Sequence, residues 1–194
     1  KKINIMKIIC IIPIHNEELR LNELLTKINE YSKINKFYID FLLINSGSKD
    51  NSLNIIKKYK FNYISLKKNR GVGYVFLIGL KIAKKLNYDV MIQMAGNNKM
   101  SPYDIDGMIK PILEKNIDYV SGTRFRFKKN YENNPKFRIF AIKILSFLFS
   151  KIFGKKTTDA TCGFRAFKIK KVYPYFKYFN KKKKLYLWLR VLFL

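Results

Sequence analysis

The 194-residue sequence predicts a single α/β domain with a mostly parallel central sheet flanked by helices. The first observation is that short apolar segments alternate with segments of helical periodicity, which is the pattern of βαβ units. The second is the segment 88–102, YDVMIQMAGNNKMSP, where a short apolar run stops at small and turn-forming residues. The third is size, because a chain of this length with 48% hydrophobic residues can bury a substantial core.

The expected elements follow one another as strand and helix along the chain. The first strand is expected over 3–14, and a helix follows it to residue 34, with Leu21, Leu24, Leu25 and Ile28 at helical spacing. Further strands are expected at 37–44, 63–66, 90–94 and 119–121. Further helices are expected at 53–59, at 70–86 after a glycine-rich opening, and at 104–115.

Four polar loops follow expected strands, at 13–17, 45–50, 95–99 and 123–124. The carboxyl ends of parallel strands meet at one edge of an open sheet, and ligands bind there. Taken alone, the segment 88–102 is better explained as an ordinary connection between a strand and a helix. The common edge of the four loops nevertheless predicts one binding site.

The C-terminal part differs in composition. The segment 135–153 is basic and aromatic, and it predicts a helix that either lies on a membrane surface or packs into the core. The segment 173–194 continues this composition and includes the run Lys181 to Lys184. We therefore expect a domain over 1–168 and a basic, aromatic-rich C-terminal segment over 169–194, either truncated or membrane-associated.

Charge and cysteine usage restrict the function classes. The formal net charge of +27 predicts an anionic partner, although basic residues are spread along the whole chain as a biased composition would spread them. No nucleic-acid-binding motif or clustered basic face is visible, so nucleic acid is not an expected partner. Cys10 and Cys162 lie far apart and form no zinc or disulfide pattern. No secretory signal or membrane span is recognisable, which predicts a cytoplasmic protein.

Five segments, in order, resemble the motifs of the family 2 glycosyltransferases with a GT-A (Rossmann-like) fold. They are IIPIHNEE at 11–18, INSGSKDNS at 44–52, NRGVGYVFLIGLKIA at 69–83, VSGTRF at 120–125 and TTDATCGFRAF at 157–167. The resemblance covers about 8–167 and is closest to the polyprenol-phosphate branch, typified by dolichol-phosphate mannosyltransferase. It implies a hexosyltransferase of the cell envelope, peripheral at the cytoplasmic face of a membrane.

The resemblance also implies a pocket for the base, ribose and pyrophosphate of a nucleotide-sugar donor. Its expected residues are Pro13, His15, Glu17, Ile44, Ser46, Arg70, Ala95 and Gly96. His15 is expected to stack on the donor, or else to be a partly exposed loop residue. Glu17 is expected to accept hydrogen bonds from the donor, although a carboxylate in the first turn of a helix is independently favoured.

The sequence departs from the family at the loop that usually carries D-x-D. Ala95 and Asn97 stand at its two acidic positions, and Asn45 and Ser46 replace two aspartates of the preceding loop. The family's cofactor is Mg²⁺ or Mn²⁺, and such hard cations favour carboxylate oxygens. Asn97 stands at the degenerate position of that site, and no residue is assigned as a metal ligand. Cationic side chains are expected to offset phosphate charge instead, namely those of Lys99, Arg70, Arg124 and Arg165.

The implied reaction is a single displacement with inversion, from the nucleotide sugar to a lipid (polyprenol) phosphate at an anionic membrane surface. The residues expected to take part are Asn97, Lys99, Arg124, Asp159 and Arg165. Asp159 and Arg165 would belong to the acceptor side, and a turn-capping role explains Asp159 almost equally well. The alternative functions are a catalytically impaired relative that only binds a nucleotide or lipid phosphate and, last, a nucleic-acid-binding protein.

Overall fold

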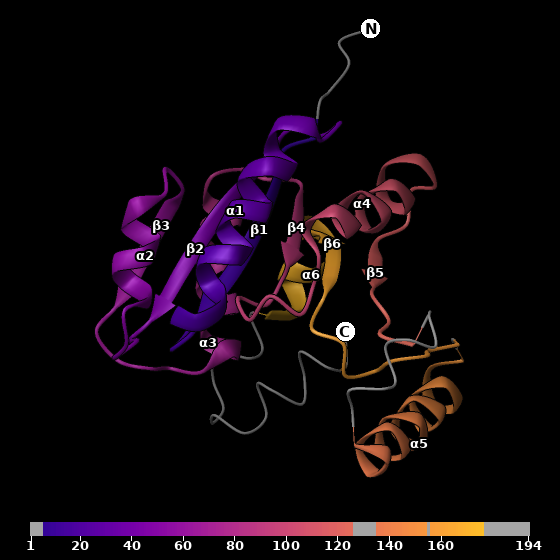
Figure 1. Ribbon diagram of the computed structural model, residues 1–194. Coiled ribbons are helices and arrows are strands. Elements are labelled where there is room, and N and C mark those ends of the chain that lie inside the picture. The colour runs from indigo at the N-terminus through magenta and orange to yellow at the C-terminus, as the bar shows by residue number, and fades with distance from the viewer. Residues whose placement is uncertain (1–5, 126–134, 155, 177–194) are drawn as a thin grey trace, which may run out of the picture.

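A computed structural model describes residues 6–125, 135–154 and 156–176 of the chain, and it confirms the expected α/β domain (Figure 1). Its six-stranded sheet has the order β3-β2-β1-β4-β6-β5. The strands are β1 Ile8–Ile14, β2 Ile39–Ser46, β3 Asn62–Leu66, β4 Val90–Gln93, β5 Tyr119–Ser121 and β6 Arg165–Lys168. The helices are α1 Glu18–Ile34, α2 Ser52–Lys58, α3 Val72–Lys85, the short 3-10 helix η1 Pro102–Asp104, α4 Ile105–Glu114, α5 Lys136–Phe153 and α6 Ile169–Phe176.

The core lies on both faces of the sheet because the central strand β1 is apolar at every position. In β1, Ile8, Cys10 and Ile12 pack under α1, α2 and α4, whereas Ile9 and Ile11 pack under α3 and α6. Side chains alternate between the faces of a strand, so a continuous apolar run serves two layers of helices. The result is a three-layer arrangement with the sheet in the middle (Figure 1).

Strand direction decides which residues meet at the edge where the site lies. The pairs β1 with β2, β1 with β4, and β2 with β3 are parallel. Strand β6 runs antiparallel to both of its neighbours, β4 and β5. The carboxyl ends of β1, β2, β4 and β5 therefore share one edge with the amino end of β6, where Arg165 is paired with Gln93 and with Ser121.

The clearest departures from expectation concern three elements. Strand β2 begins and ends two residues later than the expected 37–44, because its register with β1 continues to Asn45. Strand β6 and helix α6 were not predicted, because four residues of strand give too short an apolar pattern. Ile169 and Val172 of α6 pack in the same core cluster as α3, so 169–176 belongs to the folded domain. The predictions for 1–5 and 177–194, including the lysine run, lie outside the described residues.

Helix α5 stands off from the sheet at the lower right of Figure 1. Only a narrow stripe of it is buried, formed by Ile142, Ser146 and Phe149. Most of its apolar side chains are exposed, and Phe137 is the most exposed at 82%. The core-helix alternative therefore does not describe α5, which offers the apolar face that an interfacial helix would need. Among the described residues, we find no helix with both the length and the hydropathy required to cross a bilayer.

Candidate functional site

A pocket of about 280 Å³ lies at the carboxyl ends of β1, β2 and β4. It is where an open α/β sheet is expected to bind a ligand. Seven of the sequence-predicted site residues line it together. The lining residues are Pro13, Ile14, His15, Glu17, Ser46, Asn69, Gly71, Val72, Val75, Ala95, Gly96 and Asn97.

Hydrogen bonds between loops give the pocket its floor. The loop after β1 is tied to the loop after β2 by the Asn16 N–H, which donates to Ser48 Oγ at 3.1 Å, and by the Glu17 N–H, which donates to Ser52 Oγ at 2.9 Å. The loop after β4 comes still closer, because a Cβ at Gly96 would lie 2.6 Å from the Pro13 carbonyl oxygen. Only glycine permits that approach without a shift of the backbone.

Two polar groups in the pocket lack protein partners. His15 Nδ1 is the one buried side-chain nitrogen or oxygen, within the described parts of the chain, that has no hydrogen-bond partner. The Glu17 carboxylate stands at the N-cap of α1 without making a side-chain cap. Burial raises the pKa of Glu17, and the positive charges of Arg20 and Lys99 partly oppose that rise. Buried polar groups without partners are costly, so these two are groups that a ligand can satisfy.

The loop after β4 does not offer the ligands of a hard cation. Ala95 has no side-chain donor atom, and Asn97 Oδ1 already accepts a hydrogen bond from the Lys99 N–H at 3.2 Å. The described residues contain no group of three or more histidine, cysteine or acidic side chains that could hold a metal ion. A Mg²⁺ or Mn²⁺ ion is best held by carboxylate oxygens, so the residues present do not fit one.

Two of the predicted cations, Lys99 and Arg70, are not among the residues that line the pocket. Lys99 is exposed and near enough to Glu17 for its charge to lower that residue's pKa. Arg70 does not line the pocket, although its N–H donates to Ser46 Oγ at 3.2 Å. Its guanidinium carbon lies 4.7 Å from the ring centroid of Tyr74, so the charge is held over an aromatic face.

Ile44 was expected in the pocket, and the structure places it elsewhere. Its side chain is fully buried beneath α3, in one cluster with Val75 and Leu80. The reason is strand alternation, which turns Leu43 toward α1 and Ile44 toward the opposite face. Ile44 is therefore a core residue.

Pattern reasoning missed five lining residues, which are Ile14, Asn69, Gly71, Val72 and Val75. Asn69 Oδ1 accepts hydrogen bonds from Ser46 Oγ at 3.3 Å and from the Gly71 N–H at 2.8 Å, so it joins the ends of two loops. The sequence feature that could have indicated Asn69 was its position directly before Arg70-Gly71. Val72 and Val75 lie in the first turn of α3, and their apolar character gave no sign of a pocket wall.

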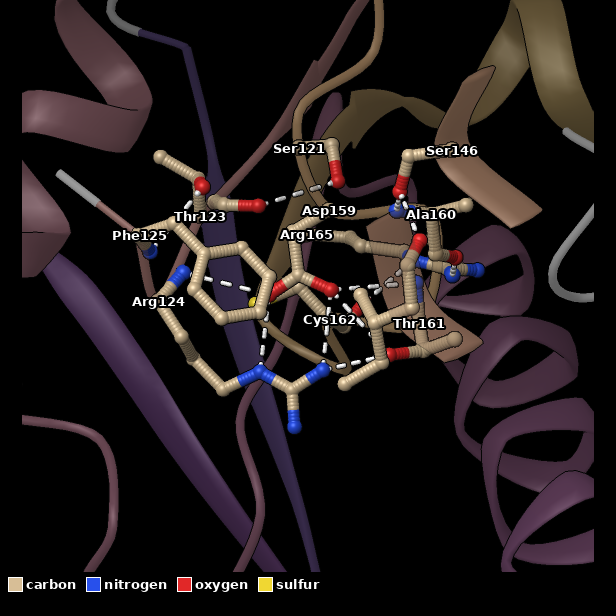
Figure 2. Close-up of polar contacts among 12 residues, drawn as sticks. Ser121, Thr123, Arg124, Phe125, Ser146, Asp159, Ala160, Thr161, Cys162 and Arg165 are labelled. Atoms are coloured by element: carbon tan, nitrogen blue, oxygen red, sulfur yellow. Dashed lines mark hydrogen bonds and ion pairs between the residues drawn. The ribbon is translucent and has the colours of Figure 1, made fainter. Parts of the chain in front are cut away.

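Arg124 was expected to face the same cleft as Ser46 and Asn97, but it does not line the pocket. Instead its guanidinium donates two hydrogen bonds to Asp159, from Nε to Oδ2 at 2.7 Å and from Nη2 to Oδ1 at 2.8 Å (Figure 2). The Arg124 N–H also donates to Oδ2 at 3.1 Å. A fork of this kind is the strong, geometrically defined form of an arginine–carboxylate pair.

Asp159 is buried and fully engaged. Its Oδ1 also accepts from the Thr161 N–H at 3.2 Å and from Thr161 Oγ1 at 3.1 Å, so the expected turn-capping role is present beside the ion pair. Burial alone would raise the pKa of Asp159, but the hydrogen bonds from Arg124 outweigh burial and hold it below its ordinary value. The same bonds raise the pKa of Arg124.

Arg165 opens β6 and is buried. Its Nε donates to the Cys162 carbonyl oxygen at 2.9 Å and its Nη2 donates to the Ala160 carbonyl oxygen at 3.3 Å. These two hydrogen bonds hold the loop before β6 in place. A second cavity, of about 450 Å³, lies on the far side of that loop against α5. It is lined by Phe125, Lys143, Ser146, Phe147, Ser150, Lys156, Thr157 and Thr158, so it combines two cations, four hydroxyls and two rings.

Comparison with known families matches residues 9–176 to the model described as "Glycosyl transferase family 2". Among curated proteins, the chain is 28% identical over 174 residues to the UDP-N-acetylglucosamine–dolichyl-phosphate N-acetylglucosaminyltransferase of Methanococcus voltae, covering 81% of the chain and 67% of that protein. It is 28% identical over 175 residues to a dolichyl-phosphate β-glucosyltransferase of Trichomonas vaginalis, covering 81% and 52%. It is 27% identical over 174 residues to an undecaprenyl-phosphate 4-deoxy-4-formamido-L-arabinose transferase of Proteus mirabilis, covering 87% and 50%. The chain thus spans about half to two thirds of these relatives.

Solved structures share the fold. Mannosyl-3-phosphoglycerate synthase of Rubrobacter xylanophilus superposes with a TM-score of 0.67 at 11% identity, covering 84% of the chain and 53% of that protein. Glucosyl-3-phosphoglycerate synthase of Mycobacterium tuberculosis, in complex with Mn²⁺, UDP and phosphoglyceric acid, superposes with a TM-score of 0.64 at 14% identity, covering 85% and 56%. These likenesses bear out the expected fold.

Proposed function

The chain belongs to glycosyl transferase family 2, and from that premise we propose that it transfers a sugar from a nucleotide-sugar donor to a polyprenol phosphate with inversion. The three relatives described above differ in the sugar that their names give, but each name includes a dolichyl or undecaprenyl phosphate. A lipid phosphate is therefore the acceptor class that they share.

The pocket at the ends of β1, β2 and β4 carries the donor part of the proposal. It leaves His15 Nδ1 buried without a partner and the Glu17 carboxylate without a cap. A nucleotide offers both complements, because ribose hydroxyls donate to a carboxylate and a base presents donors and acceptors to an imidazole. We assign the base and ribose to this pocket.

The transfer step needs no group beyond the two substrates. An oxygen of the acceptor phosphate attacks the anomeric carbon, the new carbon–oxygen bond forms, and the bond to the donor's β-phosphate oxygen breaks. Its electron pair leaves on the nucleoside diphosphate. The acceptor is already an anion, so this step does not depend on a general base. Lys99, in the loop after β4, supplies positive charge toward the leaving diphosphate, and the proposed step involves no metal ion.

The second cavity and α5 suit the acceptor. Lys143, Lys156 and the exposed hydroxyl of Thr158 can bind a phosphate, and none of the described residues that line that cavity is acidic. The exposed apolar side chains of α5 adjoin it through Phe147, which lines the cavity and is itself 60% exposed. We place the lipid chain along this face, with the protein bound peripherally to an anionic membrane.

One observation favours a second candidate, a protein that binds the donor or a lipid phosphate without transfer. Both acidic positions of the loop after β4 are lost, at Ala95 and Asn97. In that case the pocket would still be occupied, but the leaving diphosphate would lack the stabilisation that makes turnover fast.

The decisive experiment is calorimetric titration of GDP-, UDP- and CMP-sugars into the protein, with Mn²⁺ and with EDTA, followed by a turnover assay with polyprenyl phosphate in vesicles. We expect one donor class to bind in EDTA and sugar to be transferred. Binding without turnover would favour the second candidate, and failure of all donors to bind would refute both.

Two variants sharpen the titration. Lys99→Ala removes a charge-assisted phosphate contact and should weaken donor binding by about 1.5–3 kcal/mol, roughly ten- to a hundredfold. The double variant Ala95→Asp, Asn97→Asp returns two carboxylates to one loop and should make donor binding stronger with Mn²⁺ than with EDTA. Loss of wild-type donor binding in EDTA would mean that another metal site exists, and the role given to Lys99 would then be wrong.

A further inference from the structure

We propose that Asp159 is a positioning residue that holds Arg124 in one orientation, so that the remaining nitrogen, Nη1, is presented to the acceptor phosphate. This inference rests on the proposed function, because it names the group that reads the acceptor. It differs from the sequence-based expectation, in which Asp159 and Arg124 were two separate members of a site. The grounds are the geometry of the pair, the anchoring of its loop and the exposure of its two ends.

The pair has one buried end and one accessible end. The Asp159 side chain is 0% exposed, whereas the Arg124 side chain is 32% exposed. Asp159 occupies Nε and Nη2 of the guanidinium, and Thr161 Oγ1 also accepts from Nη2. Figure 2 shows the third nitrogen of Arg124 directed away from Asp159, with no contact drawn to it. Two N–H donors on Nη1 are therefore left for a ligand, in a plane that the fork has fixed.

The loop that carries Asp159 is anchored independently of Arg124. On one side, Ser146 Oγ of α5 accepts from the Ala160 N–H at 3.0 Å, and Ser150 Oγ accepts from the Thr157 N–H at 2.8 Å. On the other side, Arg165 donates to the Ala160 and Cys162 carbonyl oxygens. Asp159 thus reaches Arg124 from a loop held both by the helix with the exposed apolar face and by the sheet.

The same contacts argue against a proton-transfer role for Asp159. Its two oxygens accept hydrogen bonds from three donors of Arg124 and two of Thr161. A carboxylate so fully engaged, with its pKa held below the ordinary value, has neither a free lone pair facing a substrate nor the basicity to accept a proton at neutral pH. Its effect on a substrate must therefore pass through Arg124.

The location of the pair fits the acceptor rather than the donor. Arg124 does not line the donor pocket, whereas its neighbour Phe125 lines the cavity against α5. Thr158, the residue before Asp159, lines the same cavity. The pair therefore stands beside the cavity to which the acceptor phosphate has been assigned.

The test is a double-mutant cycle on the full chain, read by calorimetry with farnesyl phosphate as a short polyprenyl phosphate. Asp159→Asn and Arg124→Ala should each weaken farnesyl phosphate binding by about tenfold, and the double variant should be no weaker than Arg124→Ala alone. The affinity for the nucleotide sugar, which a general loss of structure would also reduce, should stay unchanged. Arg124→Lys, which keeps the charge but not the fork, should bind farnesyl phosphate about as weakly as Asp159→Asn.

The matched control is Asp118→Asn, which removes one carboxylate from the ion pair with Lys168 at the other end of β6. It should leave both affinities unchanged. The positioning role alone is overturned if wild-type protein binds farnesyl phosphate and Asp159→Asn binds it equally well. It is also overturned if the losses of affinity in Asp159→Asn and Arg124→Ala add in the double variant. Wild-type protein that binds the donor but not farnesyl phosphate overturns the acceptor class as well. If Asp159→Asn does not fold, the comparison of Arg124→Lys with Arg124→Ala decides the question. Equal donor affinities together with equally weak binding of farnesyl phosphate would support the positioning role. Full binding of farnesyl phosphate by Arg124→Lys would refute it.

Discussion

Around the ends of β1, β2 and β4, the side chains of His15 and Glu17 keep groups without hydrogen-bond partners, whereas the Asp159 carboxylate beside β5 and β6 is fully engaged. His15 Nδ1 is buried and unpaired, while the buried Asp159 carboxylate accepts hydrogen bonds on both oxygens. The difference teaches how each region would meet a ligand. The first leaves these two groups for the ligand, and the second uses the Asp159 carboxylate to fix the orientation of the Arg124 guanidinium.

The largest effect that would sharpen this contrast concerns Asp159. Asp159→Asn should lower the free energy of unfolding by about 3 kcal/mol at pH 7, because it breaks a largely buried ion pair. The pKa of Asp159 lies below its ordinary value when folded, so the contribution is present in full above the unfolded pKa of about 4 and is lost as pH falls through the folded pKa. The difference between wild type and variant, measured by urea unfolding, should therefore shrink between pH 5 and pH 2.

The control for that measurement is again Asp118→Asn, whose carboxylate is 46% exposed. An ion pair whose carboxylate is in water contributes little to stability, so this variant should be nearly as stable as wild type at pH 7. Equal losses in the two variants would contradict the distinction between an engaged, buried pair and a surface pair.

The second effect has the opposite sign. His15→Phe keeps a ring in the donor pocket and removes the unpaired Nδ1, so the free energy of unfolding should stay the same or rise by up to about 2 kcal/mol. Donor affinity should fall in the same variant, because the group left for the ligand is gone. Urea unfolding and donor titration on one preparation measure both. A variant that is less stable than wild type would show that His15 has a structural partner in solution.

The smallest effect concerns α5. Lys151 lies near the exposed ring of Phe147, with its Nζ 5.8 Å from the ring centroid, so it borders the apolar face. Lys151→Gln should weaken binding to anionic vesicles by about 1 kcal/mol at most, roughly fivefold, and leave binding to neutral vesicles unchanged. Vesicle sedimentation at low and high salt measures this, and wild-type binding should weaken with salt. Equal partitioning into neutral and anionic vesicles at low salt would rule out the electrostatic part.

The sequence was sufficient to predict the elements that carry strong periodicity, and it placed the loops of the donor pocket on one edge. Pro13, Glu17, Ser46 and Gly96 come together because parallel strands end together, which pattern and motif order imply. Ile44 could not be placed, because a strand that is apolar on both faces gives no sign of which residue faces which layer. The helical segment 135–153 was predicted, but only the structure distinguishes its buried stripe from its exposed face.

Polar partnerships were harder to predict than elements. The fork between Arg124 and Asp159 joins two motifs through the antiparallel strand β6, and four residues of strand are too few to be recognised from alternation. Once β6 is placed beside β4 and β5, the loops before β6 and after β5 necessarily meet. The orientation of Arg124 therefore depends on β6, the strand that was hardest to predict.

The pairing of Ser121 with Arg165 has a consequence for how such a chain can change. The polypeptide leaves the sheet after β5 and re-enters it on the neighbouring strand, so everything between these two positions is an excursion closed at its base by a ladder of hydrogen bonds. The entropy of closing a loop grows only slowly with its length, so the excursion can be lengthened or exchanged at little cost to the sheet. The part of the molecule that would recognise the acceptor is thereby separable from the part that would hold the nucleotide, and grafting 123–161 from a relative, which leaves the core residues Cys162 and Phe164 in place, is a direct route to a new acceptor range.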